Sequence, residues 1–259
     1  FRDLLAAEWI KLRSLRSTGW TVSLTAVFVV GAAAVAALAD YRNLAGTSTQ
    51  VPRGFLPFDA FPPVGNVTLM IVAGSIGALT VAGEYGSGLI CTTTVAVPAR
   101  GSVVLAKAAV TATLWTLVGT ATSTASFLVS QAILNGRHAG VPITHPGVFQ
   151  ALAASALLAP VSALIGLGLA ALIRHSAATM VTVACTLLMS TLFSQGARWS
   201  ADVNHAMVFS AWQCLVRNWR PSPDYHGYAA TVQGSWIVYT LWPIAALVAA
   251  VATVRHRDT

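Results

Sequence analysis

The sequence has very few charged residues for its length. Only 9% of its 259 residues are Asp, Glu, Lys or Arg, whereas soluble domains have about 25%. Hydrophobic residues make up 56%, and the mean hydropathy is +0.70. A folded surface that faces water needs more polar cover than this composition supplies. The shortage of charge therefore excludes a soluble protein and predicts an all-α integral membrane protein.

Motifs for several kinds of chemistry are also missing. Cys91, Cys185 and Cys214 form no Cys-x-x-Cys pair, and the six histidines have no His-Glu-x-x-His spacing, so we expect neither a disulfide nor a metal site. The phosphate-binding pattern GxxxxGK[ST] is absent, and neither lysine, Lys11 or Lys107, lies in a glycine-rich loop. We therefore expect no ATP hydrolysis by this chain alone, and no other enzymatic activity.

The positive charge does not indicate nucleic-acid binding. The net charge is +7, but the cationic residues are scattered singly, without the basic patch that a nucleic-acid site requires. Cations that flank membrane spans and contact anionic lipid headgroups explain the same excess of positive charge.

Residues 74–77 read Gly-Ser-Ile-Gly, a pattern that could indicate an intramembrane serine protease. Such an enzyme needs a base near the serine, and no clearly membrane-embedded His is available. Close packing of helices is the better interpretation of these small residues.

Long uncharged runs divide the sequence into about six expected transmembrane helices. A span needs about 20 mostly apolar residues, and its backbone must be helical because lipid offers no hydrogen bonds. The expected spans of this single transmembrane domain, residues 1–259, lie near 20–38, 65–83, 107–134, 149–172, 177–193 and 235–254. If the N-terminus is cytosolic, nine Lys and Arg residues lie inside and six outside, which favours two cytosolic termini.

Three segments between the spans are expected to have distinct roles. Residues 1–19 contain an apolar stripe with Trp9 and basic residues, which predicts a helix on the membrane surface. Residues 84–106 form the longest cytosolic loop. Residues 194–234 form an extracytosolic segment, whose apolar piece 207–216 is too short to span and predicts a re-entrant or interfacial helix.

This arrangement resembles the ABC-2 family of ABC-transporter permeases, particularly its small six-span actinobacterial type. The resemblance rests on the basic, Trp-containing N-terminal stretch and on motifs after the second span, at residues 5–14, 82–88, 92–94, 97–101 and 105–107. It implies a permease that pairs with a second permease, identical or homologous, and with separate ATP-binding cassette subunits that bind ATP and Mg²⁺. It also implies a bacterial cell membrane.

The resemblance assigns roles to particular residues. It places a coupling helix for the ATPase in loop 84–106, with coupling residues Glu84, Tyr85, Gly86, Arg100 and Gly101. Trp9, Lys11 and Arg13 would anchor the N-terminal helix at the interface. Glu84 and Arg100 are otherwise ordinary charged residues at span ends, and Trp9 is otherwise an ordinary interfacial residue.

The expected function is ATP-driven export of an amphipathic compound, such as a drug, antibiotic or peptide. Thr113, Thr116, Thr120 and Ser123 in the third span are candidates for a substrate path, although hydrogen bonds between helices and to their own backbones are the favoured explanation. The alternatives are a non-transporting scaffold or sensor subunit and an ion-coupled carrier. A carrier usually buries ionisable residues at mid-membrane, and the expected spans contain none there.

Overall fold

The structure is a computed structural model that describes residues 1–14, 16–46, 60–87, 100–193, 197–216 and 230–257. Within these ranges all regular secondary structure is helical, without strands, as the sequence predicts. Cys185 and Cys214 are free thiols, and Cys91 lies outside the described residues. Because helices satisfy their backbone hydrogen bonds internally, this architecture suits a lipid environment.

Five helices are long and apolar enough to cross a membrane, which indicates a membrane-embedded protein. They are α2 (Arg16–Gly46), α3 (Pro63–Ser87), α5 (Arg100–Asn135), α6 (Val148–Ile173) and α10 (Val232–Arg257). Each corresponds to an expected span but extends beyond it at both ends. The reason is that backbone hydrogen bonding continues past the apolar window, into polar residues that a hydropathy argument removes.

The expected span at 177–193 is a shorter element. It consists of α7 (Ser176–Leu188) and the 3-10 turn η1 (Met189–Leu192). The 13 residues of α7 extend about 20 Å at 1.5 Å per residue, less than the roughly 30 Å of a hydrocarbon core. Arg174, with a left-handed φ of 60°, ends α6 and allows the chain to turn into α7.

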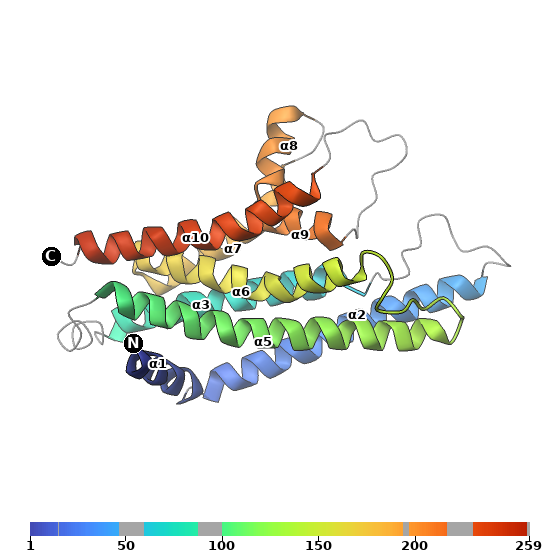
Figure 1. Ribbon diagram of the computed structural model, residues 1–259, viewed down its shortest axis with the longest axis horizontal. Helices are drawn as coiled ribbons and strands as arrows, with labels where there is room; N and C mark the ends of the chain where they lie inside the picture. The colour runs from blue at the N-terminus through green and yellow to red at the C-terminus, as the bar shows by residue number, and fades with distance from the viewer. Residues whose placement is uncertain (15, 47–59, 88–99, 194–196, 217–229, 258–259) are drawn as a thin grey trace.

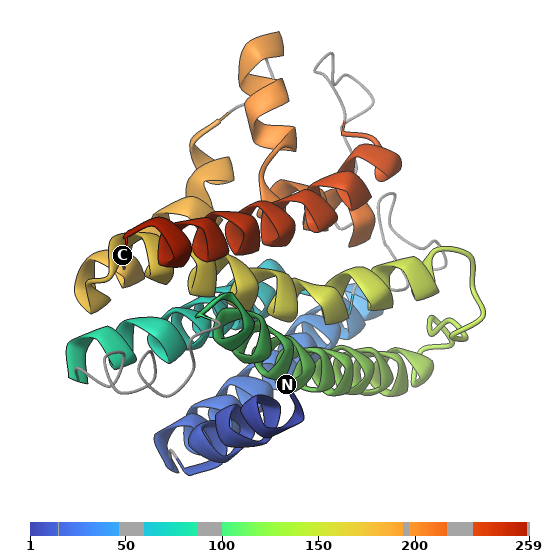
Figure 2. The same cartoon turned by 60° about the vertical axis from the view of Figure 1, so that its left-hand side comes forward.

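Helix α6 is the centre of the bundle. Of its span, 72% is buried inside the protein, against 22% for α2 and 17% for α10. It packs against α3, α5, α10 and α7, and Figures 1 and 2 show it between α10 and the α3–α5 pair. The two outer helices, α2 and α10, leave most of their apolar surface for lipid or another chain.

Glycines make the close contacts of α6 possible. A Cβ atom on Gly77 of α3 would overlap the backbone carbonyl of Ala163, and one on Gly119 of α5 would overlap that of Ala156. Gly166 of α6 lies in the same way against the carbonyl of Gly74. Gly74 and Gly77 therefore lie in a helix contact, which is the packing role that the sequence favours for residues 74–77.

The remaining helices lie at the margins of the bundle. Helix α1 (Arg2–Ser14) precedes α2, and the start of α1 and the end of α10 lie at the same end of the bundle (Figure 1).

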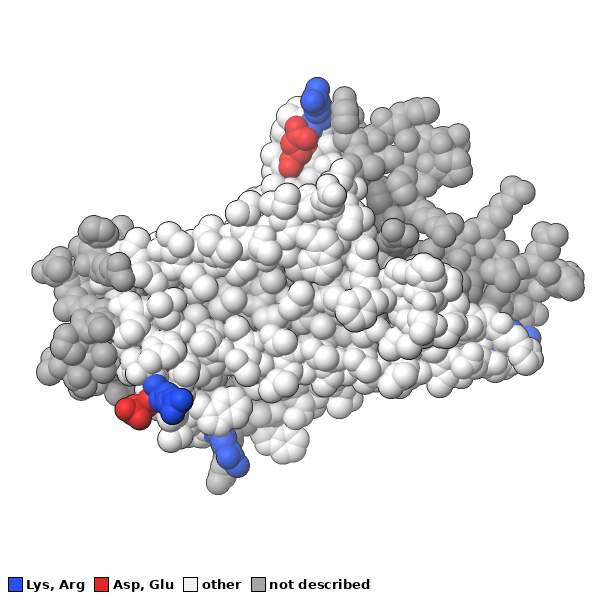
Figure 3. Space-filling view, viewed as in Figure 1, with Lys and Arg blue, Asp and Glu red and all other residues white. Residues whose placement is uncertain are grey.

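Helix α9 (Val208–Val216) is close to the expected apolar piece 207–216. It packs on α10 and α6, and its Trp212 Nε1 donates a hydrogen bond to Ser155 Oγ of α6 at 3.1 Å. Helix α8 (Arg198–His205) projects sideways. On the face in Figure 3, charged side chains lie on this projection and near the bundle ends, with uncharged surface between them.

The contact between Gly77 and α6 gives a first prediction. Replacing Gly77 with Ala places a methyl group against the Ala163 backbone, so we expect a loss of about 1–3 kcal/mol, as for other overpacked cores. Thermal unfolding of the purified chain in detergent measures the change. The matched control is Gly83→Ala in the same helix, where an added Cβ meets no atom within 4 Å. Equal unfolding temperatures for the two variants would contradict the packing account.

Candidate functional site

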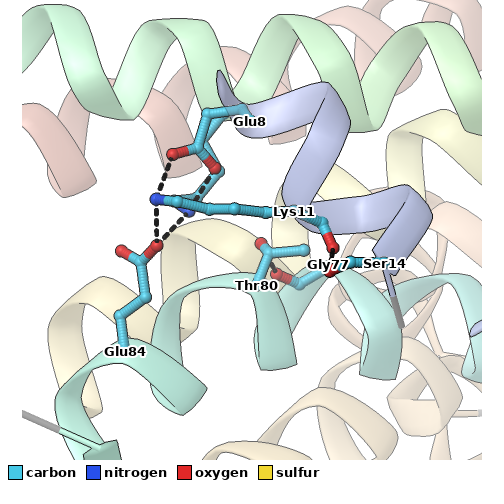
Figure 4. Close-up of polar contacts among 7 residues, drawn as sticks. Glu8, Lys11, Ser14, Gly77, Thr80 and Glu84 are labelled. Carbon is cyan, nitrogen blue, oxygen red and sulfur yellow. Dashed lines mark hydrogen bonds and ion pairs between the residues drawn. The ribbon is translucent and has the colours of Figure 1, made fainter. Parts of the chain in front are cut away.

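The only two glutamates and the only two lysines of the sequence come together at one end of the bundle. Glu8 and Lys11 lie on α1, Glu84 on α3 and Lys107 on α5. Figure 4 shows Glu8 and Lys11 pointing from α1 toward Glu84. We call these four residues the charge ring. Three helices that are distant in sequence therefore meet through the same four side chains.

The charges alternate in sign around the ring. Lys11 Nζ lies 2.7 Å from Glu8 Oε1 and 2.9 Å from Glu84 Oε1. Lys107 Nζ lies 2.6 Å from Glu8 Oε2 and 2.9 Å from Glu84 Oε1. Each ammonium thus bridges both carboxylates. A compact ammonium with three rotatable N–H donors suits this bridging better than the planar guanidinium of Arg.

Most of the ring is removed from solvent. Glu8, Glu84 and Lys107 are buried, whereas the Lys11 side chain is 46% exposed. Charges in such a place cost several kcal/mol each unless they are paired, and here opposite charges balance. Burial opposes the charge of Lys11, but hydrogen bonds from its ammonium to Glu8 and Glu84, together with their negative charges, outweigh burial. The pKa of Lys11 is therefore raised above its ordinary value of 10.5.

Local helix geometry explains how each residue reaches the ring. Glu8 and Lys11 are three residues apart, so they share one face of α1. Glu84 lies in the last turn of α3, and Lys107 lies two turns after the start of α5. The chain between these two helices, residues 88–99, lies outside the described residues. The ring thus connects α1 to the helices on both sides of that segment.

A second contact ties the same end of α3 to α6. The guanidinium carbon of Arg174 lies 5.0 Å from the centre of the Tyr85 ring, a cation–π geometry. Arg174 is the residue with left-handed backbone that ends α6. Tyr85 follows Glu84 directly, so α3 contacts α1 and α5 through one residue and α6 through the next.

The other residues expected to couple or to anchor lie around this end. Gly86 is exposed near the end of α3, and Gly101 is buried at the start of α5. The side chain of Arg100 lies outside the described residues, as does most of the expected coupling loop. Trp9 and Arg13 are exposed on α1, whereas Lys11 is held in the ring. The coupling and anchoring roles remain predictions.

The four residues expected to form a substrate path lie along one stripe of α5, because they are three, four and three residues apart. Thr113 and Thr116 donate to the carbonyls of Ala109 and Ala112 in their own helix, at 2.8 Å each. Thr113 and Thr120 are exposed, whereas Ser123 is buried. Exposure therefore changes along this stripe of α5 and not around the helix. The two intrahelical hydrogen bonds satisfy hydroxyls within the helix, and the substrate path remains a prediction.

Sequence reasoning missed Glu8 and Lys107 as site residues. It placed Glu84 and Lys107 at or beyond the span ends, but both lie within helices that qualify as candidate spans, Pro63–Gly86 and Gly101–Asn135. The signal that could have found them is the rarity of these residue types: the sequence has only two Glu and two Lys, and all its other charged side chains are Arg or Asp.

Among the described residues, no group of three or more His, Cys, Asp or Glu side chains could hold a metal ion.

The ring predicts a large cost for removing Lys107. Lys107→Met leaves two buried carboxylates with only half-exposed Lys11, so we expect a loss of about 3–5 kcal/mol, as for a buried pair that loses one partner. Thermal unfolding in detergent measures it. Glu84→Gln combined with Lys107→Met is expected to cost less than the sum of the single changes. Strict additivity of the two changes would show that they do not interact.

The raised pKa of Lys11 predicts an alkaline effect. A lysine whose pKa is raised by folding stabilises the protein fully below its unfolded pKa of 10.5, and this contribution is lost as pH rises through the folded pKa. The comparison variant is Lys11→Arg, because Arg stays charged. We expect the difference in unfolding temperature between the two proteins to change only above pH 10.5. A difference that stays constant up to pH 12 would contradict this assignment.

Comparisons with known proteins leave the site to be interpreted from its own chemistry. No protein-family model matches the chain, and no curated protein matches it. The function must therefore be inferred from the structure itself, which is a membrane-embedded helical bundle with a buried, self-neutralising charge ring at one end.

Proposed function

We propose that this chain is the membrane-spanning permease subunit of an ATP-driven ABC exporter of the ABC-2 type. It works with a second permease and with separate ATP-binding subunits that hold ATP and Mg²⁺. Its cargo is an amphipathic compound such as a drug, antibiotic or peptide, and its place is a bacterial cell membrane. The observation that carries the proposal is the charge ring, together with the resemblance at residues 5–14 and 82–107.

The ring supports a coupling role because of what it connects. Glu84 begins the expected coupling loop and Lys107 directly follows it, and they pair with Lys11 and Glu8 of α1. A push on that loop acts on the end of α3 or α5, and the ion pairs pass it to α1 and so to α2. The Arg174 contact with Tyr85 provides a second connection, to α6. Salt-bridge networks between rigid helices are among the elements that can carry coupling between distant sites.

The proposed topology has six crossings. Helix α6 ends and α10 begins at opposite ends of the bundle (Figure 1), so the chain between them must return along its length. In the proposal, α7 and η1 begin this return and α9 completes it, with α8 displaced to the side. Both termini are then cytosolic. The charge ring lies at the cytosolic end, where the ATPase would bind.

The test is purification of the full tagged chain from its native membrane. We expect a subunit with a phosphate-binding GxxxxGK[ST] loop to copurify, and Glu84→Gln to lower the ATPase activity of the complex by about tenfold, the factor that corresponds to 1.4 kcal/mol. The control is Asp202→Asn, which removes an exposed carboxylate on α8 and is expected to have no effect.

Other outcomes distinguish the alternatives. A preparation without any ATPase, in detergent that preserves known complexes, would overturn the proposal and favour a scaffold or sensor subunit. Uptake in vesicles that follows an ion gradient would favour an ion-coupled carrier. An ATPase that copurifies equally active with Glu84→Gln would keep the permease assignment and remove Glu84 from the coupling role.

A further inference from the structure

A groove of about 490 Å³ lies beside the charge ring and is lined by α1, the start of α2, α3 and α5. This volume falls within the roughly 300–1,000 Å³ of small-molecule sites. Its apolar lining comes from Leu12, Ile76, Leu79 and Val110, and one end is formed by the ring. Leu79 and Lys11 are both partly exposed, so the groove is accessible from the side of the bundle.

A buried hydroxyl in this groove has no partner within the described residues. Thr111 is 1% exposed and lines the groove, yet its Oγ1 makes no hydrogen bond. Threonines in helices usually donate to the carbonyl four residues earlier, and Thr113, Thr116 and Thr122 of the same helix do so. An unpaired buried hydroxyl costs free energy, so a ligand with a hydrogen-bonding group would stabilise this position.

The most exposed side chain of the ring is a cation. Glu8 and Glu84 are buried, whereas the Lys11 side chain is 46% exposed. Two of its three N–H donors bond to Glu8 and Glu84, which leaves one donor for a ligand. An anionic group therefore fits the charged end of the groove better than a second cation would.

Polarity changes along the groove in the order of a phospholipid. The charged part holds Lys11, and Thr111 lies four residues beyond Lys107 on α5, about 6 Å farther along the axis. The remaining lining is apolar at Leu12, Ile76, Leu79 and Val110, with hydroxyls from Ser14, Ser17, Thr18 and Thr80. A phosphate at Lys11, an ester carbonyl at Thr111 and an acyl chain along Leu79 and Ile76, which lie successively farther from Glu84 on α3, match this order.

We propose that this groove binds one anionic phospholipid of the surrounding bilayer, which fills the space between α1 and the bundle. The headgroup phosphate accepts from Lys11, an ester oxygen accepts from Thr111, and one acyl chain covers the apolar lining. Cytoplasmic leaflets contain anionic lipids, so such a ligand is available wherever the ring faces that side. This site does not depend on an ATPase or on transport.

The experiment is native mass spectrometry of the purified full chain in detergent, titrated with phosphatidylglycerol or with phosphatidylcholine. Gly83→Leu fills the groove mouth, because Gly83 lines the groove and has no atom within 4 Å of an added Cβ. Thr111→Val keeps the shape of the side chain and removes only its hydroxyl. Neither change removes a contact within the described protein, so both variants are expected to fold.

Two control variants match these changes outside the groove. Gly31→Leu adds the same side chain to an open position on α2. Thr253→Val removes a hydroxyl that already donates to Ala249 O at 2.8 Å. Thermal unfolding without added lipid checks that all four variants are folded.

The expected result is one phosphatidylglycerol bound more tightly than phosphatidylcholine by the unchanged chain and by both controls. Thr111→Val is expected to weaken its binding about fivefold, the factor that one net hydrogen bond contributes, and Gly83→Leu to abolish it. Wild-type binding by both groove variants would overturn the proposal, as would equal affinity for phosphatidylcholine. Displacement of the lipid by water-soluble glycerol phosphate at equal concentration would also overturn it, because the site would then recognise a free phosphate.

Discussion

The demand that every backbone polar group be bonded without water is the constraint on which this structure depends. In lipid that demand allows helices and forbids open, unpaired backbone, and it also removes the hydrophobic force that would bring helices together. Association must then come from close contact. Helix α6 achieves it with glycines at its borders, where the backbones of α3 and α5 approach so closely that no side chain fits.

Against this apolar background the charge ring solves a different problem. Helix α1 has no buried apolar residue, and Glu8 is its one buried residue, so packing alone does not fix its position. Four alternating charges hold it to α3 and α5 with defined geometry. Ion pairs of this kind contribute little net stability compared with apolar packing, but a wrong position of α1 would leave buried charges unpaired. The ring therefore determines where α1 lies more than how stable the bundle is.

The sequence predicts the elements of this fold well and their contacts poorly. Charges interrupt the apolar runs, so the gaps between charges located α2, α3, α5, α6 and α10, with ends that differ by one to eight residues. Residues 74–77 indicated a tight helix contact. The same reasoning shortened the helices and so moved Glu84 and Lys107 out of them. Pairing between Glu8 and Lys107, 99 positions apart, leaves no local pattern. The unpaired Thr111 likewise looks like its bonded neighbours until their geometry is known.

The closed form of the ring has an evolutionary consequence. It contains two charges of each sign and no spare member, so any single neutral replacement leaves an odd charge inside the protein. A lineage can leave this arrangement only through paired changes, for example the loss of one Glu and one Lys together, or by passing through a less stable intermediate. Substitutions at positions 8, 11, 84 and 107 are therefore epistatic, and we expect related sequences to vary at these positions jointly, by whole pairs.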